Sequence, residues 1–87
     1  MNTEIEMPRY KCHKEVWALK IRNLKPRTPD DGTLLLEPDE VGYASFILSA
    51  EFVTKHNPQS GGYYVVYADG YKSYSPAKAF EDGYTRI

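Results

Sequence analysis

Apolar and polar residues alternate over residues 12–24, and this alternation predicts a long strand. Trp17, Leu19 and Ile21 share one face of it, which we expect to face the core. The opposite face carries several cations, so we expect water on that side. Its members are Cys12, Lys14, Val16, Ala18, Lys20 and Arg22.

Turn-forming residues divide the middle of the chain into short elements. Prolines and an Asp-Asp-Gly step over residues 26–32 predict a loop, and residues 33–37 then predict a strand that closes a hairpin with the first. Residues 44–48 predict a third strand. Ser49 then fits the N-cap of a helix from about residue 50 to residue 55 or 56, which Asn57-Pro58 ends because the residue before a proline avoids helical geometry.

A second hairpin follows Gly61-Gly62, where residues 63–68 and 71–74 predict two strands joined by Asp69-Gly70. A two-residue turn would place Val65 opposite Tyr74. The face that we expect in the core would then carry Tyr63, Val65, Tyr67, Lys72 and Tyr74.

Ser75-Pro76 has the residue types of a helix start, with serine as cap, and predicts a helix over residues 76–82. We expect Ala77, Ala79 and Phe80 to point inward, and residues 84–87 to form a last strand. Together these elements predict an α+β fold, with a small, mostly antiparallel sheet of about five short strands and two short helices. Residues 1–7 are expected to be a loose leader before one domain over residues 8–87.

Composition adds a surplus of tyrosine to this picture. The chain has 87 residues and eight tyrosines, and aromatic residues make up 14% of it. Because a core of this size cannot enclose all of the rings, we expect some at the surface. They either form a ligand site or subunit interface, or simply cover the faces of a thin sheet.

Charge is unevenly distributed, although the net charge is only −1. Residues 8–27 carry seven Lys and Arg against one Glu, whereas residues 28–51 carry six Asp and Glu without any Lys or Arg. The basic stretch could attract phosphates, or it could lie beside the acidic stretch and be neutralised by it. We favour neutralisation over binding of duplex DNA, because DNA-binding domains are usually strongly basic and the pI of this chain is 6.1. A small anionic ligand needs only two or three cations, so it stays open.

Catalytic and metal chemistry find little support in the sequence. One cysteine and two histidines cannot make a structural zinc site by themselves, and we expect no metal and no cofactor. Cys12 and His13 are neighbours on a strand and point to opposite faces, so they cannot pair with each other. We therefore expect no enzyme, with a small enzyme that uses Cys12 or His13 as a minor alternative. The lone cysteine and the lack of a membrane-length apolar run favour the cytoplasm.

Two stretches, KCHKEVWALKI at 11–21 and GGYYVVYADGYKSYSPAKAFEDGYTRI at 61–87, resemble a group of short uncharacterised proteins of tailed bacteriophages and prophages. The C-terminal pattern is also similar to the second type of phage anti-Thoeris sponge. It consists of an Ala-Asp-Gly turn at 68–70, Tyr74-Ser75-Pro76, Asp82 and Tyr84. The chain departs from that family at His13-Lys14. It also departs at the start of the last strand, where it has Tyr84 and the family has tryptophan. The similarity implies a small α+β homo-oligomer that sequesters cyclic-nucleotide immune signals without cleaving them.

The leading hypothesis is therefore a phage-encoded, non-enzymatic binding protein that sequesters a cyclic-nucleotide-like host defence signal. Cations would hold phosphates, and flat side chains would stack on bases. The alternative is a module that binds a host or virion protein through a tyrosine-rich sheet. Neither hypothesis involves a membrane, and the resemblance implies the cytoplasm of a phage-infected or lysogenic host cell. The candidate ligand-binding residues are Arg9, Lys14, Trp17, Lys20, Tyr64, Tyr71 and Ser75.

Overall fold

The computed structural model describes residues 7–11, 15–28 and 30–86. Cys12, His13 and Lys14 lie outside this range, as do residues 1–6. The expectations that concern them, including the chemistry of the Cys-His pair, therefore stay predictions. The division into a leader over 1–7 and a domain over 8–87 is a prediction too.

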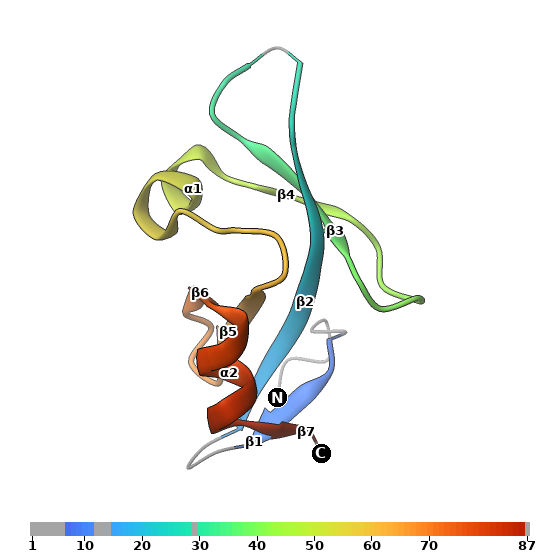
Figure 1. The fold of residues 1–87 in the computed structure, drawn as a ribbon. Helices are drawn as coiled ribbons and strands as arrows, with labels where there is room; N and C mark the ends of the chain where they lie inside the picture. The colour runs from blue at the N-terminus through green and yellow to red at the C-terminus, as the bar shows by residue number, and fades with distance from the viewer. Residues whose placement is uncertain (1–6, 12–14, 29, 87) are drawn as a thin grey trace.

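One long strand, β2 (Glu15–Pro26), organises the fold and pairs with three other strands (Figure 1). Its first half has β1 (Arg9–Lys11) on one edge and β5 (Tyr63–Tyr67) on the other. Its second half pairs with β3 (Leu34–Pro38), after a register shift between Ile21 and Asn23. All of these pairings are antiparallel, and the two halves of β2 belong to two parts of the sheet with different partner strands.

Three short strands complete the sheet within the described residues. β4 (Phe46–Leu48) pairs with β3, β6 (Lys72–Ser75) with β5, and β7 (Thr85–Arg86) with β1. The order is β4-β3-β2-β1-β7, and the β5–β6 hairpin branches from β2. With two helices beside this antiparallel sheet, the expected α+β class is confirmed.

Helix α1 (Ala50–His56) has the start and end that the sequence predicts. The Ser49 hydroxyl accepts a hydrogen bond from the Phe52 backbone N–H at 3.1 Å, which satisfies one of the free donors of the first turn. Asn57 stops the helix with a left-handed φ of 45°, and its N–H donates to the Val53 carbonyl. Local sequence therefore sets both ends of α1.

Helix α2 (Ala77–Gly83) begins one residue later than predicted, and the expected serine cap is wrong. Pro76 precedes the helix without a side-chain cap, because Ser75 still belongs to strand β6. Phe80 points inward as expected and is only 1% exposed. Ala79 is exposed, contrary to expectation.

The register of the second hairpin is one residue away from the prediction. The Tyr67 N–H donates to the Tyr71 carbonyl at 2.9 Å, and Val65 lies opposite Ser73 rather than Tyr74. The loop thus has three residues, with Gly70 in the left-handed region at φ 91°, a common hairpin geometry. A shift of one residue moves every side chain of β6 to the other face relative to β5. As a result Tyr71 shares a face with Tyr67, and Tyr74 with Tyr64.

The core lies on both faces of the β2–β5 ribbon, whereas the sequence predicted one buried and one wet face. Val16 and Ala18 are fully buried because Phe80 of α2 packs over their face. The first cluster comprises Val16, Ala18, Tyr63, Val65 and Phe80. The second, on the other face, comprises Ile21, Leu36, Leu48, Tyr64 and Val66, with Phe52 and Val53 of α1 against it.

Candidate functional site

The candidate ligand-binding residues do not share one surface. Neighbouring strand residues point to opposite faces, and the pairing of β2 with β5 therefore puts Lys20 beside Tyr63 but Trp17 beside Val66. Tyr64 is 7% exposed, and its ring lies 4.9 Å from that of Phe46. Burial raises the pKa of the Tyr64 hydroxyl. This ring belongs to the second cluster, as does the half-buried Trp17.

The remaining candidates are also dispersed. Arg9 of β1 lies opposite Trp17 of β2 in the strand register and forms an ion pair with Glu15. Ser75 lies opposite Tyr63, and the Ser75 hydroxyl donates to the Pro76 carbonyl oxygen at 3.4 Å. Lys14 is outside the described residues.

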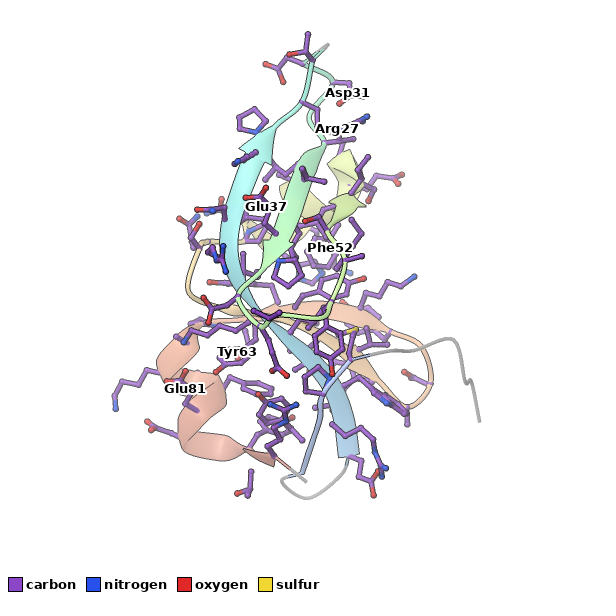
Figure 2. All side chains as sticks on the ribbon, turned by 90° about the vertical axis from the view of Figure 1, so that its right-hand side faces the viewer. Arg27, Asp31, Glu37, Phe52, Tyr63 and Glu81 are labelled. Carbon is purple, nitrogen blue, oxygen red and sulfur yellow. The ribbon has the colours of Figure 1, made fainter. Side chains whose placement is uncertain are left out.

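Lys20 takes part in a polar bridge between the sheet and α2. The Lys20 ammonium lies 2.9 Å from a carboxylate oxygen of Glu81, and the Tyr63 hydroxyl donates to the same oxygen at 2.7 Å (Figure 2). The hydrogen bond from Lys20, followed by that from Tyr63, lowers the pKa of Glu81. Burial, followed by the hydrogen bond to Glu81, raises the pKa of Tyr63. This bridge connects α2 to the sheet, and its Lys20 ammonium is already paired with a carboxylate.

The second half of the basic strand is neutralised by the acidic stretch that follows it in the sequence. Lys25 lies 3.4 Å from Glu37, across the β2–β3 pairing, and Arg22 lies 3.9 Å from Asp39. The neutralisation that the charge pattern favoured is therefore confirmed for these two residues. The β3–β4 loop is held in the same way, because the Arg86 guanidinium donates to both Glu40 carboxylate oxygens at 2.9 and 3.1 Å.

A different group of side chains gathers where the end of α1 meets the β5–β6 turn. The Lys55 ammonium lies 5.3 Å from the centre of the Tyr71 ring, and the His56 ring lies 6.3 Å from it. Tyr71 is 45% exposed and stacks at 5.9 Å on the ring of Tyr67. Only Tyr71 of this group was a sequence candidate. Lys55 and His56 lie 15 or more positions away in the chain, and no local pattern connects them.

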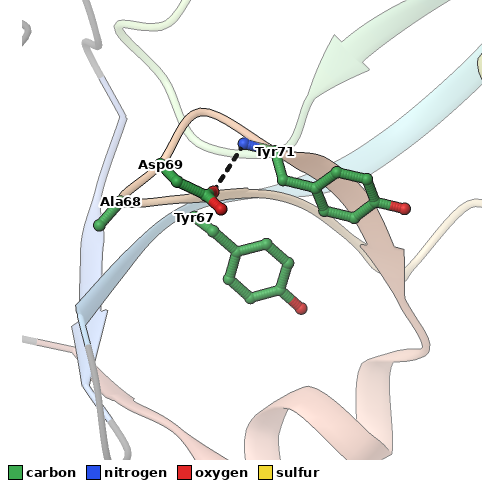
Figure 3. A pocket seen from close by; sticks show the side chains of 4 residues that line it. All are labelled: Tyr67, Ala68, Asp69 and Tyr71. Carbon is green, nitrogen blue, oxygen red and sulfur yellow. Dashed lines mark hydrogen bonds between the residues drawn. The ribbon is translucent and has the colours of Figure 1, made fainter.

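Beside these rings lies an open hollow of about 450 Å³, lined by Tyr67, Ala68, Asp69 and Tyr71 (Figure 3). The Asp69 carboxylate accepts the Tyr71 backbone N–H at 3.0 Å, which fixes the turn. The hollow is too open to surround a small molecule. It suits contact with a larger surface.

Within the described ranges no cluster of three or more His, Cys, Asp or Glu side chains is arranged to hold a metal ion. None of the helices described there is long and apolar enough to cross a membrane.

Comparison with known proteins gives one informative result. No family model and no curated protein sequence matches the chain. Among solved structures, the chain is similar to the NMR structure of the monomeric form of the phage L decoration protein. The identity is 34% over 97% of this chain, with a TM-score of 0.70. The chain spans 62% of the length of that protein, so the similarity concerns only a part of the decoration protein. The chain is thus similar to a phage protein.

Proposed function

We propose that this chain is a phage-encoded, non-enzymatic protein that binds another protein of the virion, as a decoration module on the head. The observation that supports the proposal is the similarity to a phage decoration protein, because it combines 34% identity with a shared fold over nearly the whole chain. The protein-binding alternative of the sequence analysis thus becomes the main hypothesis.

Sequestration of a cyclic nucleotide receives less support and becomes the second hypothesis. A nucleotide site needs cations and open rings on one surface. Lys20 is paired with Glu81, Tyr64 is buried, and the other candidates that the structure describes are divided between two faces. Thermal-shift measurements against cyclic dinucleotides, cyclic trinucleotides and cyclic ADP-ribose isomers test it. Saturating ligand at a hundred times its Kd would add about 2.7 kcal/mol to the stability.

Co-sedimentation tests the main proposal. Purified protein is mixed with heads of the phage that encodes it, prepared without the protein, and with heads of phage L as a related surface. The expected result is saturable pelleting at a fixed number of copies per head. Light scattering on the free protein tests the expected homo-oligomer at the same time. Protein that stays in the supernatant with both types of head, at tens of micromolar, would contradict the proposal.

A further inference from the structure

Most of the cations on the described surface are ion-paired, but Lys55 at the end of α1 is not. Lys20, Arg22, Lys25, Lys78 and Arg86 each lie within 4.0 Å of a carboxylate, as does Arg9. Among the cations whose side chains the structure describes, Lys55, Lys72 and Arg27 have neither an ion pair nor a hydrogen bond to a carboxylate, and the Arg27 guanidinium donates to the Thr33 hydroxyl instead. Glu51 is four residues before Lys55, the usual spacing for a helical ion pair, yet the lysine lies over Tyr71 instead.

This arrangement concentrates unpaired positive charge beside an exposed aromatic ring. Lys72, the first residue of β6, is exposed but lies on the strand face opposite to that of Tyr71, so Lys55 is the lysine beside the ring. Asp69 carries the carboxylate of the turn, and this carboxylate stabilises the turn by accepting a hydrogen bond from the Tyr71 backbone N–H. Stacking on Tyr67 and the ring of His56 hold Tyr71 in place. A preorganised tyrosine next to a lysine can bind without loss of side-chain freedom and without breaking an internal ion pair.

We propose that this aromatic–cationic patch, made of Lys55, His56 and Tyr71, docks an acidic segment of the partner protein. The inference rests on the proposed function and deepens it. The Tyr71 ring covers apolar atoms of the segment while its carboxylates approach the Lys55 ammonium. Tyrosine is enriched at energetically important interface positions, and charge complementarity across an interface contributes specificity. The tip of the β3–β4 loop, where Val41 is 90% exposed, is a weaker candidate, because the neighbouring carboxylates of Asp39 and Glu40 are already paired with Arg22 and Arg86.

Two pairs of variants test the patch in the co-sedimentation assay. Lys55→Glu is matched by Lys78→Glu, because both lysines are exposed and lie on seven-residue helices. Tyr71→Ser is matched by Val41→Ser, which removes an exposed apolar side chain elsewhere. We expect about tenfold weaker head binding for each patch variant and less than twofold change for each control. Melting curves verify that all four variants fold. Binding of the wild type should weaken as salt rises.

Competition distinguishes the chemistry of the partner. Polyglutamate should displace the protein from heads better than oligothymidylate of the same charge, and the reverse order would overturn the assignment to an acidic protein. Patch variants that bind as well as their controls would overturn the patch and leave the proposed function intact. If the wild type does not bind heads, the proposed function fails. The patch is then judged by NMR titration with polyglutamate, in which shifts centred on Tyr71 and His56 support it and their absence overturns it.

Discussion

The two faces of the β2–β5 ribbon are closed by different means. On the first face a single residue of α2, Phe80, stacks on Tyr63 at 4.2 Å and on Tyr84 at 4.5 Å. Tyr10 meets the same phenylalanine edge-on at 4.7 Å. On the second face α1 contributes no fully buried residue. The buried members there come from β2, β3, β4 and β5, with Phe52 partly inserted.

This difference shows how an 87-residue chain can bury both sides of a ribbon. The first face depends on one aromatic side chain and on the bridge from Glu81 to the sheet. The second face distributes the same task over several strands. Loss of one side chain should therefore cost more on the first face than on the second.

The largest effect is expected from Phe80→Ala, which removes the centre of the first cluster and should destabilise the protein by about 3–5 kcal/mol. The matched change on the second face, Phe52→Ala, removes a half-buried ring and should cost only about 1–2 kcal/mol. Urea unfolding followed by circular dichroism measures both. Equal losses for the two variants would show that the faces do not differ as described.

Gly62→Ala should destabilise the second face by about 1–3 kcal/mol through overpacking. A methyl group at this position would overlap the ring of Tyr74, which packs against the second cluster. Gly83→Ala, at the end of α2, has open space around it and should be neutral or slightly stabilising. Thermal melting of the pair measures the contrast. An unchanged melting temperature for Gly62→Ala would mean that the Tyr74 ring moves aside freely.

Ser49→Ala should cost about 1 kcal/mol, because it removes the cap of α1 on the second face. The corresponding serine before α2, Ser75, makes no cap, and Ser75→Ala should change stability by less than about 0.5 kcal/mol. Chemical denaturation distinguishes them. A larger loss for Ser75→Ala than for Ser49→Ala would contradict the assignment of the two helix starts.

The smallest effect is expected from Glu81→Gln, and it should depend on pH. Because the folded protein lowers the pKa of Glu81 below its ordinary value of 4.5, this carboxylate stabilises the fold above about pH 4.5. That contribution is lost as the pH falls through the lower, folded pKa. The stability gap between wild type and variant should therefore be present at pH 7 and close toward pH 3. Asp30→Asn, at an exposed carboxylate without an ion pair in the described chain, is the control. A pH-independent gap for Glu81→Gln would contradict the role of the bridge.

The candidate site could be predicted from sequence only in part. Tyr71 was a candidate because the predicted register put it on the hairpin face away from the expected core, although that register is wrong by one residue. Lys55 and His56 were not found, because α1 reaches the hairpin only through folding of the chain between them. Tyr64 was misplaced for a related reason. Its neighbour Tyr63 is equally apolar, and alternation cannot show that both faces of a strand are covered.

The sequence by itself determined the features that depend on neighbouring residues. It determined both ends of α1, through Ser49 and Asn57-Pro58, and the position of the Asp69-Gly70 turn. Tertiary structure alone decided the hairpin register, the burial of Val16 and Ala18, and the pairing of Lys20 with Glu81. The physical reason is range: caps and turns are hydrogen-bonded within a few residues, whereas burial and charge pairing depend on segments that meet only in the folded chain.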